Sequence, residues 1–262
     1  MSDLDRNYAS PFGRVAGRVD AATVDAGLRS YMLHIYNYMT IGLAITGLAA
    51  LGVYMAAVTT DQASAVAKVG NTYLTSFGQV MFVSPLKWVV MLAPLAMVFL
   101  LSFGIQRMRP AMAQIAFWAF AALVGMSLAS IFMVFTHTSI VRVFFITAAS
   151  FGTLSLWGYT TQRDLSGMGS FLLMGVFGII LASLVNLFMQ SSALEFAVSV
   201  IGVVVFSGLT AWDTQRLKTD YLYGAMNGET QERSAILGAL SLYLNFINLF
   251  TLLLQLLGQR DE

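Results

Sequence analysis

The chain has 262 residues, of which 58% are hydrophobic and only 10% are charged, and its formal net charge is +1. A soluble domain is about half apolar and about a quarter charged, so this much apolar surface places the chain in a membrane. The near-zero net charge, with no basic run to neutralise phosphates, argues against nucleic-acid binding. The absence of cysteine excludes disulfides, thiolate metal sites and cysteine nucleophiles.

The first 29 residues are predicted to form a flexible cytosolic tail. They are polar, rich in Gly, Ala, Ser and Asp, and they carry Arg6, Arg14, Arg18 and Arg29. The segment is too long and too charged for the n-region of a cleaved signal peptide. The first apolar stretch is therefore predicted to remain as a membrane span.

Seven stretches reach the roughly 20 mostly apolar residues that a spanning helix needs. They cover approximately residues 35–58, 87–106, 111–135, 141–159, 169–189, 196–212 and 235–257. We therefore predict an all-α integral membrane protein with a seven-helix bundle over residues 30–258 and a short C-terminal tail, residues 259–262. The long connection over residues 59–86 contains one apolar part, residues 78–83, which is predicted either to lie flat at the interface or to be plain loop.

The distribution of lysine and arginine predicts the orientation, because cytosolic loops carry an excess of them. With the N-terminus inside, the inner side holds ten of these residues: Arg6, Arg14, Arg18, Arg29, Arg107, Arg109, Arg163, Arg216, Lys218 and Arg233. The outer side holds four, namely Lys68, Lys87, Arg142 and Arg260. We predict a cytosolic N-terminus. The C-terminus is then outside, unless the last segment fails to cross the membrane.

Asp213 is the most informative position, because it follows an unbroken apolar run and stands three residues before Arg216. A carboxylate near hydrocarbon is costly and is usually functional. One interpretation is a proton- or cation-responsive group inside the bundle, either protonated or paired with Arg107 or Arg109 at the end of the second span. The alternative is an interfacial acid that pairs with Arg216 or Lys218.

Asn245 and Asn248 lie three residues apart in the last span, on one face of a helix. Asn245 is roughly 15 Å deep by helix rise. Buried amides in membranes usually form interhelical hydrogen bonds, and this structural role is the alternative to a place in a functional site.

Enzymatic chemistry is not expected. The two histidines, His34 and His137, stand at the ends of spans, and no Gly-x-Ser-x-Gly element or Gly-rich phosphate loop is present. An intramembrane aspartyl protease needs two buried carboxylates, and Asp213 is the single candidate. No cofactor is predicted, and any calcium binding is expected to be weak.

Four segments resemble the Bax inhibitor-1 family, in particular its bacterial inner-membrane branch. They are LAMVFLLSF at 95–103, GTLSLWGYTTQRDL at 152–165, GLTAWDTQR at 208–216 and ILGALSLYLNFINLF at 236–250. The resemblance covers essentially residues 30–258. It implies a seven-helix bundle with the last helix central, a location in the bacterial cytoplasmic membrane and no known enzymatic activity.

The resemblance also implies a pH-dependent calcium leak, in which two aspartates on the last two helices share a proton. The first aspartate maps onto Asp213, whereas the second maps onto Asn245, so the pair is broken here. An Asp–Asn pair lacks the repulsion that separates two coupled carboxylates, so the pH switch is predicted to be displaced to lower pH or absent. One carboxylate with amide oxygens is also a poor calcium site, since calcium takes about six to eight oxygens.

The same branch includes an inner-membrane protein that is both substrate and inhibitor of the membrane-anchored ATP-dependent quality-control protease. A polar cytosolic tail such as residues 1–29 fits the part that such a protease grips. Two functions therefore follow: binding and moderating this protease, which we rank marginally first, or a cation leak gated at Asp213. The expected surroundings are membrane lipid, with no nucleic acid. The sites named for the leak are Asp213 and Asn245, with Arg107, Arg109, Arg216 and Asn248 as supporting residues.

Overall fold

The computed structural model describes residues 21–63, 65–70, 72–224 and 228–261, with the backbone alone for residues 21–23. The helices are α1 (Ala21–Ala57), α2 (Ser76–Phe82), α3 (Leu86–Gly104), α4 (Pro110–Leu128), α5 (Ile131–Val134), α6 (His137–Thr160), α7 (Ser166–Met189), α8 (Ser192–Tyr223) and α9 (Gly228–Leu257). A 3-10 turn, η1 (Ile105–Arg107), follows α3, and the strands are β1 (Val58–Thr59), β2 (Ala67–Val69) and β3 (Thr72–Leu74).

Seven helical segments in the described ranges are long and apolar enough to cross a membrane. They correspond one to one to the seven predicted spans, and α4 with the short α5 forms the third of them. A spanning chain satisfies its backbone N–H and C=O groups within the helix, because hydrocarbon offers no partner. The prediction of an all-α seven-helix bundle is confirmed.

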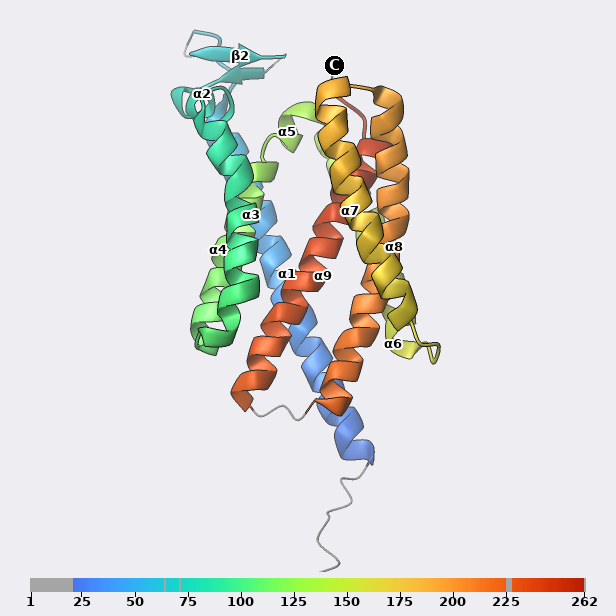
Figure 1. The fold of residues 1–262 in the computed structure, drawn as a ribbon. Helices are drawn as coiled ribbons and strands as arrows, with labels where there is room; N and C mark the ends of the chain where they lie inside the picture. The colour runs from blue at the N-terminus through green and yellow to red at the C-terminus, as the bar shows by residue number, and fades with distance from the viewer. Residues whose placement is uncertain (1–20, 64, 71, 225–227, 262) are drawn as a thin grey trace, which may run out of the picture.

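Helix α9 is the centre of the bundle (Figure 1). It packs against α8, α1, α6 and α4, and 61% of its most apolar stretch is buried. The corresponding share is 11% in α3 and 6% in α7, which lie at the periphery and each pack mainly on one neighbour, α4 and α8 respectively. The last helix is therefore central, as predicted.

The start of α1 and the end of α9 lie at opposite ends of the bundle, as Figure 1 shows. Because α9 runs the length of the bundle, the last segment crosses rather than re-entering. An odd number of crossings puts the two ends of the described chain on opposite sides of the membrane. Which side is cytosolic stays a prediction from the distribution of Lys and Arg.

The connection between α1 and α3 contains a small antiparallel sheet that the sequence did not predict. Its order is β1-β3-β2, and the register pairs Val58 with Leu74 and Lys68 with Tyr73. Helix α2 follows directly, and Thr75 caps it by accepting a hydrogen bond from the N–H of Gly78. Residues 78–83, predicted as interfacial segment or loop, thus lie largely in a short helix beside the sheet.

Part of each predicted tail lies within the described residues. The described part of α1 starts at Ala21, so residues 21–29 of the predicted tail are helical, and Leu28 is already buried in the core. The rest of that tail lies outside the described residues. The C-terminal segment is bound to the α5–α6 junction, where the N–H of Thr136 donates to the carbonyl of Gln259 (3.0 Å) and the N–H of Asp261 donates to the carbonyl of Val134 (2.9 Å).

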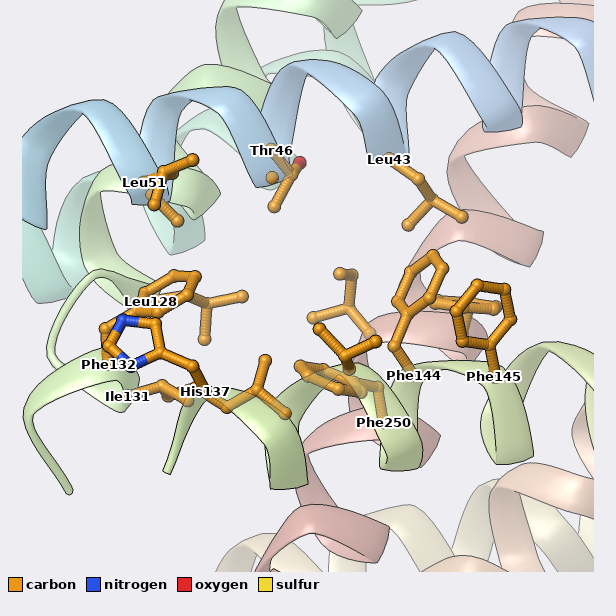
Figure 2. Close-up of a pocket in the computed structure, with 16 residues that line it drawn as sticks. Leu43, Thr46, Leu51, Leu128, Ile131, Phe132, His137, Phe144, Phe145 and Phe250 are labelled. Carbon is orange, nitrogen blue, oxygen red and sulfur yellow. The ribbon is translucent and has the colours of Figure 1, made fainter. Parts of the chain in front are cut away.

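Helices α1 and α6 meet through the Tyr36–Ser155 hydrogen bond and the Tyr54–His137 ring contact, and they leave a groove between them elsewhere. Helix α1 packs on α4, α9 and α8, whereas α6 packs on α8 and α9. Figure 2 shows the result: Leu43 and Leu51 point from α1, and Phe144 points from α6, into a space of about 470 Å³. Helix α9 contributes Phe250 to the lining. We call this space the first groove.

Candidate functional site

Asp213 lies inside the bundle, on the face of α8 that contacts α9. The residue is 3% exposed, and the neighbouring Thr210 and Thr214 are fully buried. Both threonine hydroxyls donate to carbonyls one turn earlier in α8, so they satisfy themselves within the helix. Asp213 instead has to find partners on another element, because an unpaired buried carboxylate is costly.

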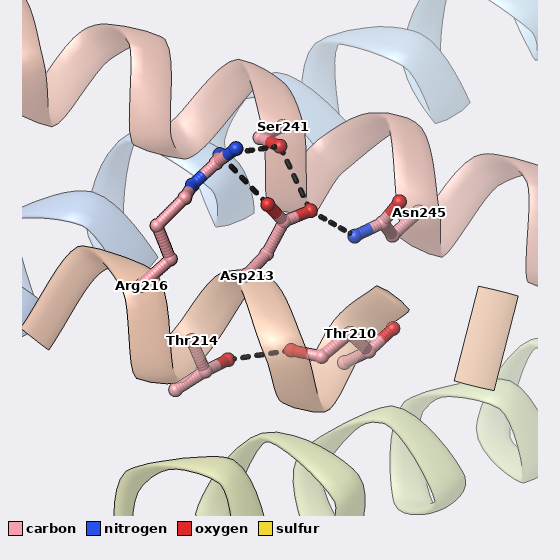
Figure 3. Close-up of polar contacts among 6 residues, drawn as sticks. All are labelled: Thr210, Asp213, Thr214, Arg216, Ser241 and Asn245. Atoms are coloured by element: carbon pink, nitrogen blue, oxygen red, sulfur yellow. Dashed lines mark hydrogen bonds and ion pairs between the residues drawn. The ribbon is translucent and has the colours of Figure 1, made fainter. Parts of the chain in front are cut away.

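Three donors surround the Asp213 carboxylate (Figure 3). The amide Nδ2 of Asn245 donates to Oδ2 at 2.7 Å, and the hydroxyl of Ser241 donates to the same oxygen at 2.9 Å. Arg216, one turn further along α8, places Nη2 2.7 Å from Oδ1. Oδ1 accepts no hydrogen bond from the described residues, so its contact with Arg216 is an electrostatic pairing without hydrogen-bond geometry. These four residues form the Asp213 cluster.

Arg216 connects the buried carboxylate with the surface. Its side chain is 40% exposed, and the guanidinium lies 4.8 Å from the centre of the Trp212 ring, in a cation–π contact. It also donates a long hydrogen bond of 3.4 Å to Ser241. A polar cavity of about 730 Å³, lined by Arg216, Lys218 and the connection between α6 and α7, opens beside it. The cluster therefore has one cation that contacts both the interior and the aqueous edge.

The residues around Asp213 hold α8 tightly against α6 and α7. A Cβ at Gly158 of α6 would overlap the backbone carbonyl of Ala211, so these two helices approach at their backbones. Gly169 of α7 gives the same close approach to the Trp212 ring. Gln215 binds the α6–α7 connection by accepting from the N–H of Leu165 (2.8 Å) and donating to the carbonyl of Arg163 (2.7 Å). Contacts with α6, with α7 and with the α6–α7 connection therefore fix the part of α8 that carries Asp213.

Two further sets of buried hydroxyls join helices near the cluster. Tyr36 of α1 is hydrogen-bonded to Ser155 of α6, which in turn contacts Thr214 of α8 at 2.9 Å. Thr46 of α1 is 2.5 Å from the hydroxyl of Tyr243 on α9, and it donates to the carbonyl of Ala121 on α4 at 2.9 Å. Such bonds add to packing as the forces that hold helices together in lipid.

The sequence-predicted site residues are brought together in part. Asp213 and Asn245 meet, and the charge partner of Asp213 is Arg216, one of the two partners considered for an interfacial acid. Arg107 and Arg109 stand exposed in the α3–α4 connection and are not among the contacts of the carboxylate in the described chain.

Asn248 lies outside the cluster, because its amide donates to the carbonyl of Leu244 within α9 (2.8 Å). Sequence reasoning missed Ser241. Its spacing of four residues before Asn245 is the signal that could have found it, since positions four apart share a helix face.

The described residues contain no group of three or more His, Asp or Glu side chains that could hold a metal ion. All three contacts of the Asp213 carboxylate come from donors, which supply no oxygen ligands for a cation in this arrangement. Chemically, the cluster holds a buried negative charge that one partly exposed cation and two neutral donors compensate.

The fold and the site define a multi-pass helical membrane protein with a buried carboxylate network. Residues 28–262 match the family described as "Inhibitor of apoptosis-promoting Bax1". The chain belongs to this family, the Bax inhibitor-1 family, and is a multi-pass protein of the bacterial inner membrane.

Three relatives align with this chain over 90% or more of the length of both proteins. The chain is 47% identical to protein RP147 of Rickettsia prowazekii over 240 residues, which is 92% of this chain and 94% of the relative. It is 42% identical to a Caulobacter vibrioides protein over 262 residues, the full length of both. It is 43% identical to the inner membrane protein YbhL of Escherichia coli K12 over 236 residues, 90% of this chain and 94% of the relative.

Proposed function

We propose that the protein is a non-enzymatic, regulated cation leak of the inner membrane, with the Asp213 cluster as its gate. The observation that carries this proposal is a carboxylate held 3% exposed within the bundle by a cation that is itself 40% exposed. Ionisable groups inside spanning helices are costly and typically mark ion or proton paths. A purely structural contact between α8 and α9 needs no charge.

The gate is closed when Arg216 neutralises Asp213. A proton on the carboxylate removes the attraction, and Arg216 can then turn toward the polar cavity that it already lines. The amide of Asn245 and the hydroxyl of Ser241 remain as donors on the α9 side. The two positions of Arg216 are the two states that a gate requires, and protonation biases one of them.

Flux of calcium or protons into liposomes that hold the purified protein tests this proposal, measured across about pH 5 to 8. Asn245→Asp places a second carboxylate within hydrogen-bond distance of Asp213, with a single arginine to neutralise both, so flux should become steeply pH-dependent. Asn248→Asp is the matched control, because it adds the same charge on α9 away from the cluster. Asp213→Ala should abolish gating. Absence of flux in the wild type and in every variant at every pH would reject the leak.

A second function, from a different class, is moderation of a membrane-anchored ATP-dependent quality-control protease through residues 1–29. The supporting observation is the attachment of the start of α1. Tyr31 stacks on Tyr221 of α8 with ring centres 5.1 Å apart, and its hydroxyl is 2.9 Å from that of Ser234 on α9. A protease that pulls on the N-terminus would therefore pull against three helices at once.

Deletion of residues 1–20 tests this alternative, because it leaves the described part of α1 in place. Co-purification of the protease with the full-length protein is expected to be lost in the deletion variant. A variant of unchanged length, with Arg6, Arg14 and Arg18 replaced by Gln, separates the need for charge from the need for a segment to grip. If the truncated protein still holds the protease, the N-terminal segment is not the binding element.

A further inference from the structure

The space between α1 and α6 continues beyond the first groove. A second groove of about 560 Å³ lies between the same two helices, nearer the start of α1, and Met32, Tyr36 and Leu156 are among the residues that line it. The first groove covers positions 43–51 of α1 and 137–145 of α6, and the second covers 29–39 and 151–159. The two grooves therefore follow one seam along these antiparallel helices.

Water is a poor occupant of the first groove. Its lining is apolar apart from His137 at one end and the hydroxyl of Thr46, which is already bonded to Tyr243 and to the carbonyl of Ala121. A buried water needs about two to four polar partners. An empty groove is also unfavourable, because atoms that line a gap lose their dispersion contacts.

The groove opens sideways from the bundle, where the exposed Val141 and Phe145 form its rim on α6. Both helices that flank it span the membrane, so the medium at this rim is hydrocarbon. The group that is present there at high concentration and matches the lining is a lipid acyl chain.

The second groove adds a charged end to the apolar lining. Arg29 lines it at the end nearest the start of α1, is exposed, and forms no ion pair with any carboxylate in the described chain. An unpaired arginine at the end of an apolar groove matches a phospholipid in both charge and polarity, since guanidinium binds phosphate oxygens in a fork. The hydroxyls of Tyr36 and Ser155 lie further along the same groove and are hydrogen-bonded to each other across it.

We propose that the seam between α1 and α6 is a phospholipid-binding site. An acyl chain occupies each groove, one from each leaflet, and fills the space beside the side-chain contacts that α1 and α6 make. Arg29 binds the phosphate of the lipid in the second groove. The bound lipids fill the seam between these two spanning helices.

Two glycines allow the grooves to be filled without strain. Gly47 lines the first groove and Gly152 lines the second, and a Cβ at either position would meet no atom within 4 Å. Gly52 of α1 and Gly178 of α7 have the same freedom but line neither groove, so they are matched controls. A phenylalanine at Gly47 or Gly152 would occupy the space of an acyl chain, and one at Gly52 or Gly178 would not.

The test is native mass spectrometry of the full-length protein, released from detergent in the presence of phosphatidylglycerol. The wild type is expected to retain bound phospholipid, and Gly47→Phe and Gly152→Phe should each lose one molecule while Gly52→Phe and Gly178→Phe retain the wild-type number. Equal retention in all five proteins would overturn the proposal. So would a wild type that carries no lipid and appears instead as a dimer, since a second copy would then cover the seam.

Arg29→Gln gives a second readout that does not depend on filling the core. Because one arginine near an anionic surface changes lipid affinity by about fivefold, phosphatidylglycerol should bind about fivefold more weakly to this variant. Arg109→Gln, an exposed arginine that lines neither groove, should leave the affinity unchanged. Equal affinity of wild type and Arg29→Gln would show that Arg29 does not bind the lipid phosphate. Neither readout requires ion flux, so the lipid site and the proposed leak can fail separately.

Discussion

The two sides of the bundle core are built in opposite ways. Helix α8 contacts α6 and α7 at glycines and contacts α9 through the Asp213 cluster, where both carboxylate oxygens have a partner. The seam between α1 and α6 has glycines too, yet Gly47 and Gly152 face open space. In lipid, small residues help helices associate only where another backbone moves into the gap. A glycine in a spanning helix is therefore not by itself evidence of a helix contact.

The two sides differ most in polarity. We call the contacts of α8 with α6, α7 and α9 the closed side and the seam between α1 and α6 the open side. The closed side carries a charge pair in the interior, where Oδ2 of Asp213 accepts two hydrogen bonds and Oδ1 is paired with Arg216 by charge alone. The open side exposes an apolar lining, to which hydrocarbon can bind without any cost in hydrogen bonds. Four tests, given from the largest expected effect on stability to the smallest, ask whether the two sides differ in this way.

Arg216→Ala should disturb the closed side most. It leaves the Asp213 carboxylate without its cation, and breaking a fully buried pair costs about 3 to 5 kcal/mol. Because the Arg216 side chain is 40% exposed, we expect the lower end, about 3 kcal/mol, in reversible unfolding of the protein in mixed micelles. Arg233→Ala is the control: its partner Glu229 is 72% exposed, and such pairs contribute about 0.5 kcal/mol. Similar losses in both variants would mean that Asp213 is hydrated.

Gly158→Ala and Gly152→Ala compare the two sides on one helix. A methyl group at Gly158 meets the backbone of α8, and overpacking of this kind costs about 2 kcal/mol. The same change at Gly152 meets nothing, so the gain in helix propensity should stabilise the protein by up to about 1 kcal/mol. Opposite signs in thermal unfolding would support the division, and equal losses would show that α1 and α6 pack together in the membrane.

Tyr243→Phe tests the contact between α9 and Thr46, a residue that lines the first groove. It removes the hydroxyl that pairs with Thr46, and interhelical hydrogen bonds in membranes contribute about 0.6 kcal/mol on average. A double-mutant cycle with Thr46→Val should return a coupling energy of about that size. A coupling near zero would mean that Thr46 is satisfied by the carbonyls of Gly42 and Ala121 without Tyr243.

Ser166→Ala, at the aqueous edge of the closed side, should have the smallest effect. The hydroxyl and the N–H of Ser166 both bond to Asp164, and they lower the pKa of this exposed carboxyl. Since the folded-state pKa lies below the ordinary value, the stabilisation is present above about pH 4 and is lost as the pH falls through the folded-state pKa. Unfolding midpoints of wild type and variant should differ slightly at neutral pH and converge in acid. Asp164→Asn should remove this pH-dependent difference.

Much of the fold follows from the sequence, because the membrane restricts the choices of the chain. A run of about 20 apolar residues must be a helix when hydrocarbon surrounds it, so all seven spans were found. The sheet was missed for the opposite reason. Its strands have two or three residues, Val58–Thr59 among them, and no alternation of apolar and polar positions can be recognised over such a length.

The site was predicted less completely than the fold. Asp213 and Asn245 could be named because polar residues in apolar runs are conspicuous. The choice of Arg216 over Arg107 and Arg109 depends on how α3 and α4 sit relative to α8, which loop lengths do not determine. Asn248 differs from Asn245 by three positions, and this small rotation around α9 is enough to leave it with a carbonyl of its own helix.

The order of elements along the chain gives the Asp213 cluster a consequence for biogenesis. The carboxylate is on α8, whereas Ser241 and Asn245 are on α9, which is synthesised after α8. Until α9 arrives, Asp213 has only Arg216, and a partly unsatisfied charge disfavours release of α8 alone from the insertion machinery into lipid. We expect α8 and α9 to enter the bilayer as one hairpin, and a chain truncated before Ser241 to be retained by the translocon and degraded.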